Sequence, residues 1–375
     1  VMMSRQKWFE NLFGFKEHSS TVKKKLPLEE GSLIATIKGS TKQRKFPVGE
    51  FSTPSLGELR EKVKEKAVAR NDARVLKISH IDVRDIYKTH QEPQYEGAIF
   101  QVASQFNCLE FVSAGVIPEC GVTGYASDFT QGPSCSLACP AATVYRNYYA
   151  KTPANNEGQT KDDQINNLDD LEMLVDNKTN NFWSTKNGYT NSTATRLAKF
   201  NSMCCEKTWK RDDLLASLKV GLHLNTQVIR TFEDGEAVHN VNQVFCSAIS
   251  ISYSNAGEND WEKVARIVLD ATYECTLLTA ILNAVENGSN IVVLTFIGGG
   301  VFGNKMSWIA MSIGRACAIA AHYQLDVRVA HYRNINRETA SAIETAYDRY
   351  YDKLQRGEAS NPLQTDEETN PLQID

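Results

Sequence analysis

A run of glycines near residue 300 has the composition of an anion-binding loop. Residues 291–297 read Ile-Val-Val-Leu-Thr-Phe-Ile, which is typical of a buried strand, and a helical pattern begins near residue 307. The loop between them consists of Gly298, Gly299, Gly300, Val301, Phe302, Gly303 and Asn304. Glycines permit positive φ and let several N–H groups converge on one ligand, and the next helix N-terminus adds partial positive charge. A tight turn would need only one glycine, so the loop is expected to bind a phosphate.

Two common nucleotide-binding loops do not fit this run. The Gly-Lys-Ser/Thr ending of the triphosphate loop is absent after residue 303, and the glycine spacing differs from GxGxxG. The sequence therefore predicts a phosphate cradle of another kind.

Three carboxylates lie in or just before a long predicted helix. Asp270 and Glu274 are one helical turn apart in its apolar part. A buried carboxylate must find a partner or its pKa rises, so both are candidates for catalysis or for binding a substrate guanidinium. The alternative is a structural ion pair with Arg266 or Arg315. Asp260 is either a further catalytic carboxylate or a helix cap.

The order of the remaining elements indicates the fold class that would position these groups. In the C-terminal half, predicted strands at 241–253, 290–296 and 327–331 alternate with predicted helices at 261–285, 307–323 and 339–355. Such alternation requires a mixed, largely parallel sheet with helices on both faces, a three-layer α/β sandwich. Ligands bind such sheets at the carboxyl ends of the strands, where the glycine run lies.

Changes in residue composition divide the chain into segments. We expect an N-terminal extension over 1–73 (amphipathic helix, hairpin, helix), a main domain over 74–355 with an insertion at about 150–225, and a disordered acidic tail over 356–375. In the extension, Pro54 is expected at the first position of a helix running to Arg70, with a Ser55–Glu58 capping box. Pro140 should divide a helical stretch near 133–149.

The composition excludes several other classes of protein. The 375 residues are 42% hydrophobic and 23% charged, with a formal net charge of −4, so a basic nucleic-acid binder is not expected. The nine cysteines form no paired CxxC spacings, so we expect no metal site and reduced thiols, in the cytoplasm or nucleus. No long uncharged apolar run indicates a membrane span. No cofactor is implied, and a monomer is expected.

The glycine run and two earlier motifs together resemble the macrodomain superfamily. Residues 299–303 are similar to its second phosphate loop, which reads small-small-Gly-Val-aromatic-Gly. Residues 100–107 are similar to its first loop, which ends in Asn, although Gln105 and Phe106 replace the usual small pair. Residues 84–87, Arg-Asp-Ile-Tyr, are similar to the family's Gly-Asp-Ile-Thr. The three occur in family order, and the resemblance covers roughly residues 75–350.

The resemblance implies that the chain binds ADP-ribose. Asp85 would accept from the adenine amine, Asn107 would contact the ribose far from adenine, and the glycine loop would hold the diphosphate. Phe302 would line that distal ribose. The remaining implied binding residues are Ile86, Gln105, Tyr332 and Asn334. Alternatives are a turn residue for Asp85 and a core residue for Tyr332.

A glycine-containing stretch at 121–133 occupies the place of the catalytic loop in hydrolytic macrodomains. The paired glutamates of poly-ADP-ribose glycohydrolases are absent from it, and Asp128 is its only carboxylate. Asp128 would activate water or hold the ribose hydroxyls. Alternatively, it caps the following helix together with Thr130.

Three hypotheses for the function follow. The first is an ADP-ribosyl hydrolase that removes mono-ADP-ribose from protein side chains, with arginine as a candidate carrier. The second is a non-catalytic reader of ADP-ribosylated proteins. The third is an interaction protein whose glycine loop is only a turn.

Overall fold

The structure of the chain is built around a seven-stranded mixed sheet. The computed structural model describes residues 6–36, 42–70 and 73–363. The strand order is β4-β9-β10-β6-β11-β12-β5. The strands are β4 Glu50–Ser52, β5 Lys77–Val83, β6 Ile99–Ala103, β9 Gly221–Ile229, β10 Ala237–Cys246, β11 Ile291–Leu294 and β12 Asp326–Tyr332. All neighbours from β10 to β5 pair in parallel, and β9 is antiparallel to both β4 and β10. The predicted mixed, largely parallel sheet is confirmed.

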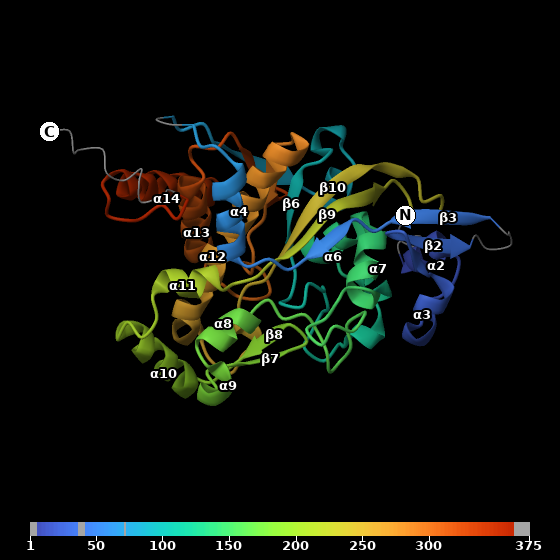
Figure 1. The fold of residues 1–375 in the computed structure, drawn as a ribbon, viewed down its shortest axis with the longest axis horizontal. Helices are drawn as coiled ribbons and strands as arrows, with labels where there is room; N and C mark the ends of the chain where they lie inside the picture. The colour runs from blue at the N-terminus through green and yellow to red at the C-terminus, as the bar shows by residue number, and fades with distance from the viewer. Residues whose placement is uncertain (1–5, 37–41, 71–72, 364–375) are drawn as a thin grey trace.

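Helices cover both faces of the sheet, which makes three layers (Figure 1). One face carries α4 Leu56–Lys66, α12 Glu258–Asn287, α13 Met306–Ile319 and α14 Arg337–Gln355, and the other carries α6 Gln131–Ala138 and α7 Pro140–Tyr148. Successive side chains of β6 point to opposite faces. Ile99 belongs to the core under α12, whereas Phe100 and Val102 belong to the core under α6. Pro140 begins α7 and so divides the helical stretch as predicted.

Helix α12 is the central helix of the larger core. Among the described residues it is the one helix that is long and apolar enough to cross a membrane, and 94% of its most apolar stretch is buried inside the fold. Its apolar composition is thus explained by packing against the sheet and neighbouring helices.

The N-terminal segment is joined to the main sheet more closely than the sequence indicated. Strand β4 pairs with β9, so it forms the edge of the main sheet, and α4 packs against α12. The Ser55–Glu58 capping box is present, but Pro54 precedes the cap instead of starting the helix, and the helix ends at Lys66, not Arg70. The N-terminal segment also contains a three-stranded sheet, formed by β1 Leu28–Glu29, β2 Ser32–Thr36 and β3 Gln43–Pro47. Two short helices, α2 Trp8–Phe13 and α3 Ser19–Lys25, complete the segment. The apolar side chains of α2 are buried, as expected for a docked helix.

The segment predicted as an insertion contains short elements beside the carboxyl edge of the sheet. They are α8 Asp169–Leu174, α9 Asn177–Asn180, β7 Ser184–Lys186, β8 Tyr189–Asn191, α10 Ala194–Cys205 and α11 Arg211–Ala216. Strand β9 already begins at Gly221, inside the predicted range, because its first residues pair with the end of β10 and with β4. Strand β10 ends at Cys246 and not at residue 253, since the chain turns there into the short 3-10 helix η4, Ile251–Tyr253. Of the predicted tail, Leu363 packs into the main core, and residues 364–375 lie outside the described residues.

Candidate functional site

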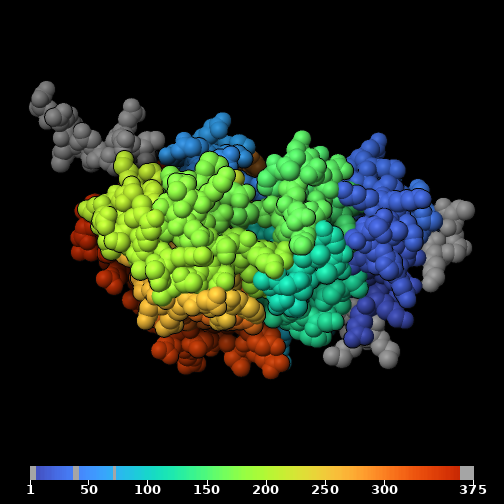
Figure 2. Space-filling view, turned by 90° about the horizontal axis from the view of Figure 1, so that it is seen from below, coloured from blue at the N-terminus to red at the C-terminus, as the bar shows by residue number. Residues whose placement is uncertain are grey.

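A cavity of about 430 Å³ opens at the carboxyl ends of β10, β6 and β11. Its walls come from the segment after β6 (103–112), from the start of α6 with the residues before it (128–133), and from the loop after β11 (295–302). Tyr189 of the insertion and Tyr253 of η4 complete the lining. Figure 2 shows the teal segment of residues near 110–130 beside the yellow-green insertion on one face of the molecule. The cavity lies at the edge where parallel α/β sheets bind ligands.

The glycine loop after β11 forms one wall of the cavity. Gly298 and Gly303 have φ of 73° and 76°, and a Cβ at either would overlap Ala248 or Ser252, so both positions require glycine. A Cβ at Gly300 would meet nothing within 4 Å. The loop is therefore pressed against the neighbouring segment at its two ends and open to the cavity in the middle.

The middle of this loop offers unused hydrogen-bond donors. Throughout the described ranges, the backbone N–H groups of Gly300, Val301 and Phe302 have no acceptor. Asn304 does not line the cavity; its Nδ2 donates to the carbonyls of Ile249 (2.8 Å) and Gly298 (3.3 Å). Asn304 thus fixes the loop, and three consecutive N–H groups are left for an anionic ligand.

The loop after β6 is held by its own side chains. Gln105 lines the cavity, and its Oε1 accepts from the N–H of Phe111 at 2.8 Å. Asn107 is fully buried, accepts from Leu109 N–H at 3.1 Å and donates to Gln164 at 2.9 Å. Asn107 is absent from the cavity lining. Its predicted contact with a ribose is therefore replaced by a role in shaping the loop.

Glu110 places a carboxyl group in the cavity wall. The side chain is 2% exposed, and its Oε2 accepts from the Ser136 hydroxyl at 2.8 Å. Its Oε1 is buried and has no hydrogen-bond partner among the described residues. Burial raises the pKa of Glu110 to about 7, although the nearby charge of Arg146 and the bond from Ser136 lower it. Near neutral pH this carboxyl group can therefore both give and take a proton.

Arg146 of α7 lies behind Glu110. Its Nη2 donates to Ser136 Oγ at 2.8 Å and lies 3.8 Å from Glu110 Oε2, and its Nε donates to the Cys108 carbonyl at 3.1 Å. The guanidinium is fully buried, 3.7 Å from the ring centroid of Phe245. This cation limits how far burial raises the Glu110 pKa, so the carboxyl stays titratable near neutral pH.

Asp128 is the second carboxylate of the lining. Its Oδ1 accepts from both the N–H (2.8 Å) and the hydroxyl (2.7 Å) of Thr130, which orders the turn before α6. The following Gln131 bonds the backbone of β6 at Ala103 N and Gln101 O, both at 2.8 Å. Asp128 thus orders the turn before α6 without capping the helix itself, since its bonds go to the N-cap residue Thr130, and it also faces the cavity.

Three aromatic rings surround the glycine-loop side of the cavity. The ring centroids of Tyr189, Tyr253 and Phe302 lie 5.2 to 5.8 Å apart in each pair. Tyr189 donates to the Phe111 carbonyl at 2.5 Å, which ties the insertion to the loop after β6. Phe302 lines the cavity, as the resemblance implied, whereas Tyr189 and Tyr253 were not among the predicted binding residues.

The carboxylates predicted on α12 are not in the cavity lining. Glu274 pairs with Arg60 Nε at 2.6 Å and Arg315 Nη1 at 2.7 Å, and Asp270 pairs with Arg211 Nη2 at 2.6 Å. The expected ion pair of Glu274 with Arg315 is confirmed. These carboxylates are thus already neutralised by the protein's own arginines, because α12 faces α4, α11 and α13.

Asp260 also serves the fold and not the cavity. Its Oδ2 accepts from Gly257 N–H at 3.0 Å at the start of α12, which confirms the capping alternative. Arg266, the other predicted partner of the α12 carboxylates, instead pairs with Glu262 at 3.2 Å.

The predicted adenine-side residues lie at the same edge of the sheet, beyond the cavity. Asp85 follows β5, accepts from Tyr87 N–H at 3.1 Å and caps the short helix α5 Ile86–Thr89, in which Ile86 is buried. Tyr332 ends β12, directly paired with Val83 of β5, and is 70% exposed, so the core alternative for Tyr332 is wrong. Asn334 is exposed just after it. None of these residues lines the cavity.

Comparisons with known proteins find weak likenesses in structure alone. No family model and no curated protein matches the chain. A poly(ADP-ribose) glycohydrolase from Thermomonospora curvata is similar at 12% identity, over 93% of this chain and 99% of that one, with a TM-score of 0.41. A poly(ADP-ribose) glycohydrolase from Deinococcus radiodurans in complex with ADP-ribose is similar at 11% identity, over 81% and 94%, with a TM-score of 0.39. The function of the chain is therefore inferred from the residues of its own cavity.

Sequence reasoning missed Glu110, Tyr189 and Tyr253. Glu110 is the only charged residue between Glu96 and Glu119, the same signal that drew attention to Glu274. The two tyrosines lie in polar segments with no spacing that marks a site, and only the fold brings them to the cavity.

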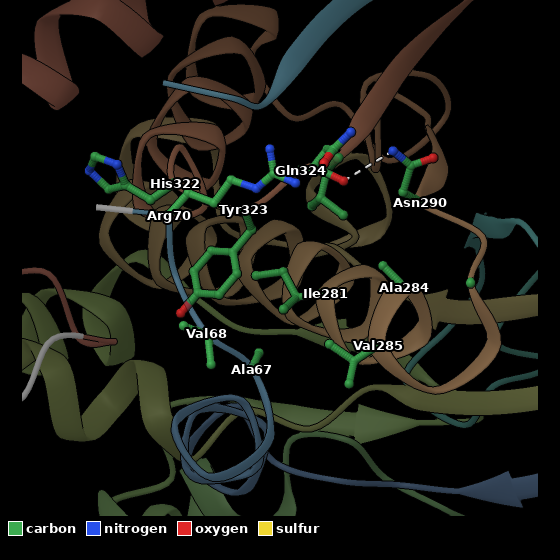
Figure 3. Close-up of a pocket in the computed structure, with 12 residues that line it drawn as sticks. Ala67, Val68, Arg70, Ile281, Ala284, Val285, Asn290, His322, Tyr323 and Gln324 are labelled. Atoms are coloured by element: carbon green, nitrogen blue, oxygen red, sulfur yellow. Dashed lines mark hydrogen bonds between the residues drawn. The ribbon is translucent and has the colours of Figure 1, made fainter. Parts of the chain in front are cut away.

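A second cavity, of about 410 Å³, lies at the amino ends of β11 and β12 (Figure 3). Ile281, Ala284 and Val285 of α12 face it, opposite Val68. Its described lining includes Arg70, His322 and Tyr323 but no carboxylate. The cavity at the carboxyl edge combines two carboxyl groups with the glycine loop and is therefore the candidate site.

Proposed function

We propose that the chain binds ADP-ribose in the cavity at the carboxyl edge and hydrolyses the glycosidic bond at its distal ribose. One observation carries this proposal. The glycine loop and Glu110 line the same cavity; among the described residues the N–H groups of Gly300, Val301 and Phe302 have no acceptor, and Glu110 Oε1 has no hydrogen-bond partner. The first can hold a diphosphate, and the second can transfer a proton at a bond next to it.

The binding mode follows from the order of the strands. The diphosphate accepts from the glycine loop after β11, and the distal ribose lies toward Glu110 and Asp128 after β6. The adenine lies on the other side, toward the end of β12, where the exposed ring of Tyr332 offers a stacking surface.

The two lining carboxyl groups supply complementary proton transfers. Glu110 is substantially protonated near pH 7 and donates to the leaving atom as its bond to the ribose anomeric carbon breaks. A water molecule then attacks that carbon, and Asp128 accepts the proton that the water releases. The products are ADP-ribose and the released acceptor.

A more specific part of the proposal concerns the acceptor, the group to which the ADP-ribose is attached. We take it to be a protein side chain carrying a single ADP-ribose. The expectation of arginine depended on Asp270 and Glu274 as partners for a substrate guanidinium. Since these carboxylates bind Arg60, Arg211 and Arg315 of the chain itself, they offer no site for an arginine side chain.

Titration calorimetry with ADP-ribose and release assays with mono-ADP-ribosylated proteins test the proposal. We expect ADP-ribose to bind and to be released, and Glu110→Gln to lower kcat by about 100-fold or more while keeping ADP-ribose affinity. The matched control is Glu119→Gln, an exposed glutamate outside the lining. Binding without release would support the non-catalytic reader, and absence of binding would reject both.

A further inference from the structure

The rim of the candidate site carries exposed apolar side chains. Val112, Phe129 and Val301 are 61%, 60% and 62% exposed. Val112 and Val301 line the cavity, and Phe129 lies between the lining residues Asp128 and Thr130. Large apolar side chains exposed together around a cavity are typical of a surface that contacts a partner.

Two of these side chains lie on the acceptor side of the proposed reaction. Val112 is two residues from Glu110, and Phe129 is next to Asp128. In the proposed binding mode the group that leaves the distal ribose lies between these two carboxyl groups. Whatever carries the ADP-ribose therefore meets Val112 and Phe129 first.

The charge of the lining restricts the kind of acceptor. The 21 described residues that line the cavity include Glu110 and Asp128 but no Lys, Arg or His. Two basic groups near the lining are engaged elsewhere, since Arg146 is buried behind Glu110 and Lys305 pairs with Glu258 at 3.1 Å. A second ADP-ribose unit would bring two further phosphate charges to a cavity whose described lining has two carboxyl groups and no Lys, Arg or His.

We infer that the rim formed by Val112 and Phe129 docks an apolar segment of protein around the modified side chain, not a further ADP-ribose unit. The inference rests on the proposed function and adds the class of acceptor. Contacts with two large apolar side chains stabilise a bound protein segment. A polyanion gains little binding energy from such contacts and is repelled by Asp128.

The experiment compares three ligands on the full chain: free ADP-ribose, a mono-ADP-ribosylated protein and poly(ADP-ribose). We expect the modified protein to bind about tenfold more tightly than free ADP-ribose and to be hydrolysed with a higher kcat/KM than poly(ADP-ribose). Equal affinity for ADP-ribose and the modified protein, or preferred turnover of poly(ADP-ribose), would overturn the inference while leaving the proposed function standing.

Variants at the rim separate docking from binding of the ADP-ribose itself. Phe129→Ser should lower affinity for the modified protein about fivefold to tenfold and change affinity for free ADP-ribose less than about twofold, with Phe129→Tyr close to the parent. The control is Met173→Ser, because Met173 is 76% exposed on α8 and absent from the lining. Equal effects of Phe129→Ser on both ligands would contradict docking at this rim. Failure of the parent chain to bind any ADP-ribose would instead reject the proposed function.

Discussion

Replacing Glu110 by Gln should change how the stability of the protein depends on pH. Glu110 is 2% exposed, and burial raises its pKa from an ordinary 4.5 to about 7. Below pH 4.5 the group is protonated in both the folded and unfolded chains, so it has no effect on stability. Between pH 4.5 and 7 the unfolded chain loses this proton while the folded chain keeps it. The free energy of unfolding therefore falls with rising pH, and levels off above 7.

The size of the effect follows from the two pKa values. One pKa unit corresponds to about 1.4 kcal/mol, so the interval between 4.5 and about 7 corresponds to about 3 kcal/mol. Gln has the shape of a protonated Glu and no charge to lose, and its amide oxygen can still accept from Ser136. Glu110→Gln should thus match the parent protein near pH 4.5 and exceed its stability by about 3 kcal/mol near pH 8.

Urea unfolding of both proteins at a series of pH values from 4.5 to 8 measures this difference. Subtracting one curve from the other cancels every titrating group that the two proteins share. Glu65→Gln is the control, because Glu65 is exposed on α4, and its difference from the parent should stay flat. A Glu110→Gln difference that varies by less than about 0.5 kcal/mol over this range would refute the account of Glu110 as a buried, partly protonated acid.

Three further predictions follow from the structure. Since Glu110 must be protonated to act as an acid, kcat/KM should fall as pH rises above about 7, and a pH–rate profile without that fall would exclude Glu110 as the acid. Gly300→Phe should keep the parent melting temperature but abolish ADP-ribose binding measured by calorimetry, whereas Gly298→Ala should lower the free energy of unfolding by about 1–3 kcal/mol. A larger loss of stability for Gly300→Phe than for Gly298→Ala would contradict the loop geometry. Glu274→Gln should cost about 3–5 kcal/mol in urea unfolding, because it removes the carboxylate that pairs with Arg315 and leaves Arg60 with only the exposed Asp212 as its ion-pair partner. Asp212→Asn is expected to cost less than about 1 kcal/mol, and an equally small cost for Glu274→Gln would show that the cluster is not structural.

Much of the fold could be predicted because its signals are local. Hydrophobic periodicity located the strands and helices of the C-terminal half, and the division at Pro140 and the Ser55–Glu58 capping box follow from the properties of single residues. The prediction errors lie at the ends of strands and at β4. The three residues of β4 have no hydrophobic alternation of their own and form a strand only because β9 lies beside them.

The candidate site divides in the same way. The glycine run after β11 was sufficient to locate a loop with open N–H groups, since positive φ and the absence of side chains are properties of glycine itself. Apolar surroundings also marked Glu274 as a carboxylate that needs a partner. Of its two partners the sequence suggested Arg315, but it could not indicate Arg60, which is 214 residues away along the chain.

What only the tertiary structure decided is which carboxyl group faces the ligand cavity. Glu110 and Glu274 each stand alone in an apolar stretch, and the sequence treats them alike. Folding surrounds Glu274 with two arginines from α4 and α13, whereas Glu110 has Arg146 near its Oε2 only and no hydrogen-bond partner at Oε1 among the described residues. A buried charge is stabilised by opposite charges within a few ångströms, and the packing of elements far apart in the sequence brings those charges there. The neighbours of a carboxylate along the chain therefore do not indicate which charges will surround it.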